Sequence, residues 1–190
     1  MQGRLDSPLT ATGRAQADAH GAAVRALGGV EAVVASPLGR TRQTAAIVNA
    51  HLQAPVEFES ALMERDCGLW SGLNAEEIGA AYPDSWRARS EDPYFHRPPG
   101  GENHADMRER VDGFLSGLMQ RPEIRLALVT HGIMSRVILG HFLALPPDET
   151  VRVRHPNDLF YRVDFVSGEI RSVHFVAGDG PFDGLLRQPD

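Results

Sequence analysis

The feature that most constrains the fold is an alternation of short apolar runs with longer helical patterns. The stretches "EAVVAS" (31–36) and "RLALVTHG" (125–132) are apolar runs of strand length, and each leads directly into a helical pattern, at 40–52 and 133–145. Strands that are apolar on both faces are buried on both faces, and helical crossovers make neighbouring strands parallel. The sequence therefore predicts an α/β fold, a mainly parallel sheet with helices on both faces.

The remaining segments predict further elements of one domain. Helical patterns occupy 10–27, 74–83 and 103–120, "VEFE" (56–59) is a possible short strand, and "LFYRVDF" and "IRSVHFV" predict an edge hairpin joined by "VSGE". Residues 82–102 are rich in Pro and Gly, which predicts an irregular lid or binding segment that selects the substrate. No repeat or linker interrupts the chain, so a single domain over residues 1–190 is expected.

Charge and composition exclude several classes of protein. The formal net charge is −6, which argues against a nucleic-acid partner, and the single cysteine rules out an intramolecular disulfide. No apolar run approaches the roughly 18 residues of a membrane helix. These features predict a cytoplasmic protein without a membrane partner.

Two arginines follow the first predicted strand, in "ASPLGRTRQTA". Arg40 and Arg42 fall at the start of the next helix, where a cation opposes the helix dipole. An anion between the guanidinium and the free backbone N–H groups would explain that placement. Two solvated arginines on a helix end explain it equally well, so both interpretations stay open.

Two other stretches carry groups suited to chemistry. In "LVTHGIMSR", His131 ends a buried strand and Gly132 permits close approach to a ligand; a buried histidine bonded to a carbonyl is the alternative, and it is favoured for a lone histidine. In "LMERDCGLWSG", Glu64 and Asp66 precede two glycines. Either could serve as a general acid near an anion, although a single such carboxylate is more often a surface group on a turn.

Taken in order, the motifs carry a resemblance. The stretches "QGRLDSPLTATGRAQA", "SPLGRTRQTA", "MERDCGLWSG", "PPGGEN" and "LVTHG" together resemble the histidine phosphatase superfamily, the phosphoglycerate mutase-like fold. The resemblance implies that Arg40 binds phosphate. Arg42 is a weaker candidate for the same role, and Gly132 is a further phosphate-binding residue. It implies that Glu64 protonates the leaving oxygen and that His131 is the second active-site histidine. Glu102 lies in the family's Gly-Glu-Ser stretch as a substrate contact, but Asn103 replaces the serine.

The resemblance also implies a segment ahead of the first motif. Members begin with a strand that ends in Arg-His-Gly, whose histidine accepts the phosphoryl group, and no Arg-His-Gly occurs in these 190 residues. The chain is therefore interpreted as N-terminally incomplete, through a misplaced start or a trimmed end, with true loss as the alternative. The expected consequences are a missing first strand, exposed apolar sheet edges, and a polypeptide that is inactive or severely impaired.

The function implied by the resemblance is phosphomonoester hydrolysis through a phosphohistidine. The modest length favours a phosphatase over a phosphoglycerate mutase-type isomerase, and a catalytically inactive phosphoanion-binding protein is the third hypothesis. No metal or other cofactor is expected, and the expected partner is a small phosphorylated substrate. The natural substrate and the oligomeric state, including a homodimer, stay open.

Overall fold

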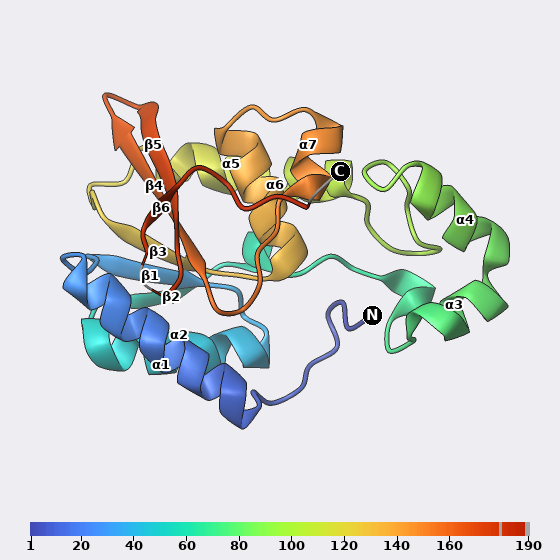
Figure 1. Cartoon of the computed structure of the whole chain (residues 1–190), viewed down its shortest axis with the longest axis horizontal. Coiled ribbons are helices and arrows are strands. Elements are labelled where there is room, and N and C mark those ends of the chain that lie inside the picture. Colours follow the sequence, from blue (N-terminus) through green and yellow to red (C-terminus); the bar gives the residue numbers. More distant parts are fainter. Residues whose placement is uncertain (179, 189–190) are drawn as a thin grey trace.

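The computed structural model describes residues 1–178 and 180–188 and shows a layered α/β arrangement (Figure 1). Its central sheet is parallel, with strand order β2–β1–β3, formed by Val56–Phe58, Ala32–Ala35 and Leu126–Val129. Ala35 pairs with both Phe58 and Val129, so the three strands end level with one another. Residues that follow the strands therefore meet at one edge of the sheet.

Both faces of this sheet are covered by helices, as predicted. Val34 packs into a core with α5 (His104–Leu118) and α6 (Gly132–Phe142), while Val33 and Ala35 pack on the other side against α2 (Gly39–Leu52). Helix α1 (Ala11–Ala26) lies against α2, so α1 and α2 are below the sheet and α5 and α6 above it in Figure 1. No helix in the described residues is long and apolar enough to cross a membrane.

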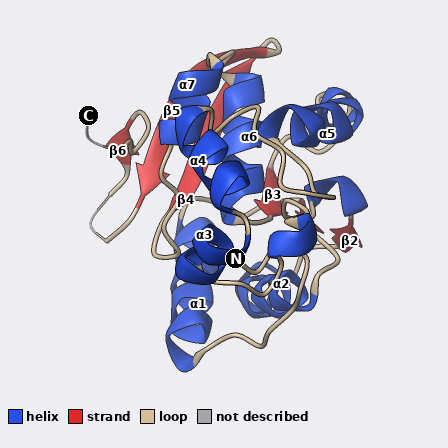
Figure 2. Cartoon of the chain, turned by 90° about the vertical axis from the view of Figure 1, so that its right-hand side faces the viewer, coloured by secondary structure: helices blue, strands red, loops and turns tan. Residues whose placement is uncertain are grey.

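The predicted edge hairpin forms a second sheet instead of closing the first. Strands β4 (Phe160–Val166), β5 (Glu169–Val176) and β6 (Phe182–Asp183) are antiparallel, and β3 and β4 are end strands of separate sheets among the described residues. The β4–β5 turn places Ser167 and Gly168 at positive φ, as a two-residue hairpin turn requires. The prediction of one mainly parallel sheet was therefore wrong for this part. Figure 2 shows β2 and the hairpin on opposite sides of β3.

The two short helices between residues 75 and 91 were predicted only in part. Helix α3 (Ala75–Ala81) falls within the helical pattern predicted over 74–83 and begins with a capping box of Asn74 and Glu77. The segment 82–102 was expected to be irregular, but its first half is helix α4 (Pro83–Glu91), which begins on proline, a favourable first helical residue. Short 3₁₀ helices at Ser60–Leu62 and Gly68–Trp70 and helix α7 (Pro147–Arg152) were not predicted.

Gly68, which precedes α3 in the chain, packs directly against the irregular segment 92–102. Gly68 has a φ of +51°, and a Cβ there would overlap the carbonyl oxygen of Pro99. The next amide, that of Leu69, donates to the same oxygen at 2.9 Å. Only glycine allows this approach, which holds the segment around residues 98–101 beside the segment that carries Glu64.

Candidate active site

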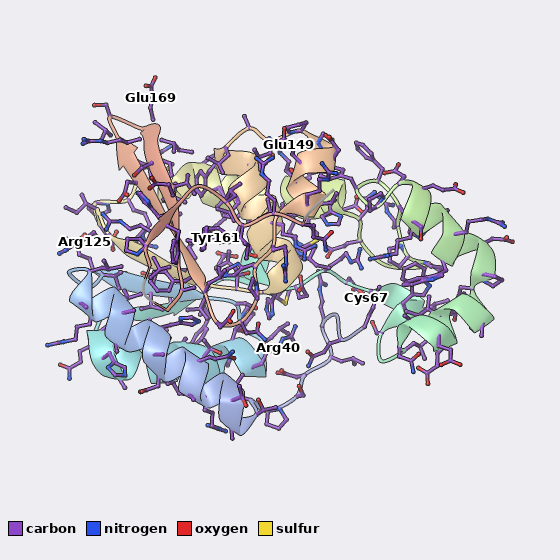
Figure 3. All side chains as sticks on the ribbon, in the orientation of Figure 1. Arg40, Cys67, Arg125, Glu149, Tyr161 and Glu169 are labelled. Carbon is purple, nitrogen blue, oxygen red and sulfur yellow. The ribbon has the colours of Figure 1, made fainter. Side chains whose placement is uncertain are left out.

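The candidate site lies where β1 and β3 end. Ser36 follows β1 and His131 caps the N-terminus of α6 after β3; the Ser36 amide donates to the carbonyl oxygen of Val129 at 2.9 Å. Both side chains are buried. Figure 3 shows Arg40 at this end of the sheet and Arg125, which precedes β3, at the opposite end. The parallel topology thus brings together residues from two distant motifs.

Arg40 and His131 are in direct contact, so they share one edge of the sheet. The Arg40 Nε–H donates to His131 Nδ1 at 3.2 Å, and His131 Nε2 lies 2.8 Å from Ser36 Oγ. Because Nδ1 accepts, the neutral ring carries its proton on Nε2 and donates it to Ser36. Burial first, and then the Arg40 charge, lower the pKa of His131 to about 3. His131 is therefore a neutral imidazole near pH 7.

The N-terminal segment accepts the remaining hydrogen bonds of the Arg40 guanidinium. The two terminal nitrogens of Arg40 donate to the carbonyl oxygens of Leu5 at 2.7 Å and Gly3 at 2.8 Å. The Asp6 carboxylate accepts from the backbone amides of Arg40, at 3.0 Å, and of Gly39. An anion does sit at the start of α2, and in this structure it is the chain's own Asp6. The sequence does not indicate this contact, because nothing in the pattern shows which distant helix a loop carboxylate reaches.

Glu64 lies against the start of α6. Its carboxylate oxygens accept from the amides of Ile133 and Met134 at 3.2 Å, and one also accepts from the Arg65 amide at 2.9 Å. The Thr130 hydroxyl donates to the Leu62 carbonyl oxygen at 2.8 Å, which ties the end of β3 to the same segment. A carboxylate on a helix N-terminus is electrostatically stabilised. Glu64 and His131 therefore flank the same helix start, Glu64 partly exposed and His131 buried.

Two predicted contacts lie at the margin of this arrangement. The Arg42 guanidinium stacks 3.8 Å over the Phe58 ring, and its Nε donates to the Pro37 carbonyl oxygen at 2.7 Å. Arg42 is therefore directed to the β2 side and is not brought to His131. Gly132 is the exposed first residue of α6, and among the described residues nothing beyond its chain neighbours and its own helix backbone lies within 4 Å of the place of a Cβ. Space for a ligand is therefore available beside that residue.

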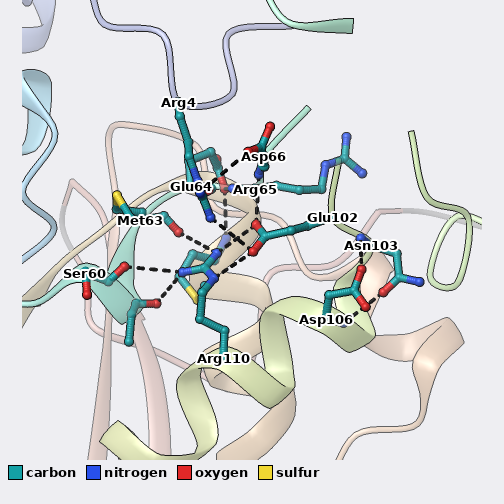
Figure 4. A network of polar contacts seen from close by, with 12 residues as sticks. Arg4, Ser60, Met63, Glu64, Arg65, Asp66, Glu102, Asn103, Asp106 and Arg110 are labelled. Carbon is teal, nitrogen blue, oxygen red and sulfur yellow. Dashed lines mark hydrogen bonds and ion pairs between the residues drawn. The ribbon is translucent and has the colours of Figure 1, made fainter. Parts of the chain in front are cut away.

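Glu102 belongs to a separate ionic network, drawn in Figure 4. Arg110 binds it with two nitrogens at 2.9 and 3.1 Å, Arg4 donates at 3.1 Å, and the Asp66 amide donates at 2.9 Å. Arg110 also donates to the carbonyl oxygens of Ala61 and Met63. In this structure Glu102 thus holds the segment around residue 64 against α5 and does not touch Arg40 or His131.

Asn103, which stands where the resembled motif has serine, begins α5. Its side-chain oxygen accepts from the Asp106 amide, and the Asp106 carboxylate accepts from the Asn103 amide. This capping box supports the helix start that carries His104. Within the described residues, no group of three His, Cys, Asp or Glu side chains is placed to hold a metal ion.

Acidification is expected to destabilise the fold through His131. Its folded-state pKa of about 3 lies below the ordinary value of 6.5, so between these values the unfolded chain binds more protons, and the free energy of unfolding decreases as the pH is lowered. A His131→Gln variant should lose up to about 1.4 kcal/mol per pH unit of that slope. Urea unfolding between about pH 5 and about pH 7.5 measures it. Equal slopes in both proteins would contradict a buried neutral ring.

The chain also matches known proteins. The model of the "Histidine phosphatase superfamily (branch 1)" matches residues 1–177. A relative from Salmonella paratyphi B, "Probable phosphoglycerate mutase GpmB", is 32% identical over 167 residues, which cover 87% of this chain and 77% of that protein. The family and the relative span the Arg40, Glu64 and His131 motifs.

Solved structures show the same fold. A mycobacterial glucosyl-3-phosphoglycerate phosphatase with inorganic phosphate superposes with a TM-score of 0.80 at 25% identity, over 95% of this chain and 91% of that one. The α-ribazole phosphatase from Shigella flexneri gives a TM-score of 0.82 at 21% identity, over 90% and 84% of the two chains. With the family match over most of its length, this chain belongs to branch 1 of the histidine phosphatase superfamily.

Proposed function

We propose that this site binds and hydrolyses phosphomonoesters. The observation that carries the proposal is the contact between Arg40 and the neutral His131 at the carboxyl ends of β1 and β3, with Glu64 on the same helix start. A guanidinium, an imidazole N–H and helix N-terminal amides are the groups that bind a phosphoryl dianion. In this structure oxygens of the chain itself accept from these donors, and a bound dianion would displace them. The same donors would also stabilise the charge that develops on the phosphoryl oxygens during transfer.

The reaction divides into two balanced steps. A histidine nitrogen forms a bond to phosphorus while the bond from phosphorus to the ester oxygen breaks, and Glu64 gives its proton to the departing oxygen. Water then attacks phosphorus, its proton passes to the Glu64 carboxylate, and phosphate and the free histidine are released. Glu64 thereby returns to its starting protonation state.

His131 is poorly suited to be the accepting histidine. Its Nδ1 lone pair accepts from Arg40 and its Nε2 hydrogen faces Ser36, so neither nitrogen offers a free lone pair. The proposal therefore gives His131 the role of binding the phosphoryl group. The accepting role is assigned to an Arg-His-Gly strand supplied in addition to these 190 residues, so the 190-residue polypeptide alone should be nearly inactive.

A phosphoglycerate mutase-type isomerase is the second candidate, favoured by the name of the 32% identical relative. The phosphatase is preferred because a superfamily structure of 25% identity that is named as a phosphatase holds inorganic phosphate and aligns with 95% of this chain. Binding of phosphoanions without turnover is the third candidate. Assays with p-nitrophenyl phosphate and with 3-phosphoglycerate, read for phosphate release and for isomer formation, separate the three.

Phosphate binding to the 190-residue chain is expected to depend on Arg40 and not on Arg42. Arg40→Ala removes a charged donor from the site and should weaken binding by about 10–100-fold, as loss of a charged hydrogen bond does. Arg42→Ala is the matched control, because Arg42 lies in the same turn of α2 as Arg40 but its guanidinium stacks on Phe58. Calorimetric titration with phosphate or orthovanadate measures both. Equal and negligible changes of phosphate affinity in the two variants would contradict the assignment of the site.

A further inference from the structure

A buried serine is the fixed partner of His131. Ser36 is completely buried, and its Oγ lies 2.8 Å from His131 Nε2. The Ser36 backbone is held on both sides, since its amide donates to the Val129 carbonyl oxygen and its carbonyl oxygen accepts from the Thr41 hydroxyl, both at 2.9 Å. Pro37, the next residue, restricts Ser36 further to extended conformations. The Ser36 hydroxyl is therefore a rigidly placed group at one nitrogen of the ring.

The two partners of the ring differ in what they can donate and accept. The Arg40 guanidinium has only donors, so His131 Nδ1, 3.2 Å from the Arg40 Nε, has to accept in this structure. A hydroxyl can donate as well as accept, and its hydrogen rotates to suit the partner. Ser36 accepts from the Nε2–H because Arg40 leaves the neutral ring no other tautomer. The direction of the Ser36 contact is thus set by Arg40 and not by the serine.

An anion bound at Arg40 reverses the demand on His131 Nδ1. Because the Arg40 Nε–H is directed at Nδ1, an oxyanion that takes over this hydrogen bond comes to the Nδ1 side of the ring. Ser36 closes the Nε2 side, where the Leu38 amide also lies 3.5 Å from the same Oγ. The oxygens of a phosphoryl dianion only accept hydrogen bonds, so Nδ1 has to present a hydrogen to them.

A hydrogen at Nδ1 changes the need at the other nitrogen. A neutral imidazole has one N–H, so Nε2 then becomes an acceptor, and a buried acceptor without a donor is unfavourable. The Ser36 hydroxyl can supply that donor by rotating its hydrogen toward Nε2, without movement of its oxygen. Protonation of both nitrogens is opposed by burial, which together with the Arg40 charge lowers the pKa of His131 to about 3.

We propose that Ser36 is a positioning residue whose hydroxyl accepts from His131 Nε2 when the anion site is empty and donates to it when a phosphoryl group is bound. This inference rests on the proposed phosphomonoester chemistry. Water gives one proton to Nδ1 and receives one from Nε2, so the Nδ1–H bond forms, the Nε2–H bond breaks and the ring stays neutral. His131 then donates to the phosphoryl oxygens and presents no free lone pair to phosphorus in either state.

NMR of the 190-residue chain with ¹⁵N-labelled histidine reads the position of the ring proton directly. Bare and protonated imidazole nitrogens resonate far apart, Nε2 couples to both ring C–H hydrogens, and His131→Gln identifies the His131 signals among those of the eight histidines. Without ligand, Nε2 should be protonated and Nδ1 bare. With saturating inorganic phosphate in mildly alkaline buffer, where phosphate is mainly a dianion, the pattern should reverse. An unchanged pattern, or two protonated nitrogens, would overturn the proposal.

Variants identify the hydroxyl as the donor to Nε2. In phosphate-bound Ser36→Ala, the bare Nε2 resonance should move to the position of a nitrogen without a hydrogen bond. Ser36→Thr keeps a hydroxyl and should restore the original resonance. If Ser36→Ala does not fold, Ser36→Cys, whose thiol is a weaker donor, should shift the resonance in the same direction by less. The same Nε2 resonance in these variants and in the unaltered protein would contradict donation by Ser36.

Thr41→Val is the matched control. Thr41 is a buried hydroxyl residue of the same segment, but it donates to the carbonyl oxygens of Ser36 and Leu38 and not to the ring. Its loss should leave the protonation pattern of His131 unchanged with and without phosphate. A changed pattern in this variant would mean that the ring responds to any disturbance of the segment, which would also contradict the specific role of Ser36.

The outcome separates the role of Ser36 from the proposed function. Phosphate binding that depends on Arg40, with an unchanged ring pattern, rejects the role of Ser36 and keeps the anion site. A reversed pattern with phosphate binding that is independent of Arg40 keeps the role of Ser36 and rejects the assignment of Arg40. Absence of phosphate binding to the unaltered chain rejects both.

Discussion

A strand ending in Arg-His-Gly, joined ahead of residue 1, is expected to raise phosphatase turnover by about 10⁴–10⁶-fold over the 190-residue polypeptide. Loss of a covalent nucleophile has effects of this order in other enzymes. His131 cannot substitute for the nucleophile because its Nδ1 lone pair accepts from Arg40 and its Nε2 proton is directed to Ser36. Rapid quench in alkaline detergent, in which phosphohistidine is stable, should trap phosphohistidine only in the extended protein.

The free edge of β3 is where such a strand fits. β3 ends its sheet, β4 begins the other, and a parallel neighbour of β3 would bring its own carboxyl end beside His131. The control is the same extension with Arg-Gln-Gly, which supplies the strand without the nucleophile and should add hydrogen-exchange protection to β3 without raising turnover. If the 190-residue polypeptide turns over as fast as the extended form, the nucleophile has been misidentified.

Glu64→Gln in the extended protein is expected to slow hydrolysis of alkyl phosphates by about 10²–10⁴-fold, the usual contribution of a general acid. The loss on p-nitrophenyl phosphate should be much smaller, because nitrophenolate leaves without being protonated. Comparing kcat for the two substrates measures the difference.

Asp66→Asn is the matched control, because Asp66 is a neighbouring carboxylate that contacts Gly68 and Arg4 and not α6. It should slow neither substrate appreciably. Equal losses on both substrates in Glu64→Gln would mean that Glu64 matters only as the cap on the Ile133 and Met134 amides.

The parallel sheet and the meeting of Arg40 with His131 could be predicted because both depend on local signals. A buried apolar run, the polar residue that ends it and the helix that follows are contiguous in sequence. Parallel topology then places strand ends at one edge without any knowledge of side-chain contacts. The capping box of α3 was predictable for the same reason.

Features that depend on distant partners could not be predicted. Glu102 reaches Arg4 across 98 positions and Asp6 reaches Gly39 across 33, and no periodicity encodes either pairing. The hairpin's alternation predicts β4 and β5 but not the sheet that they join. Helix α4 was missed because it begins on a proline and its polar and charged residues form no apolar stripe; no α4 residue is buried.

The attachment of residues 3–6 to Arg40 has a consequence for ligand affinity. The Gly3 and Leu5 carbonyl oxygens and the Asp6 carboxylate act as tethered competitors, because they belong to the same chain as the guanidinium that they contact. A free phosphate must displace at least some of them, so its apparent dissociation constant equals the intrinsic value of the site divided by the fraction of time that the segment is away from the guanidinium. The same competition speeds the exit of bound phosphate, since an internal acceptor is always at hand to take its place on the guanidinium.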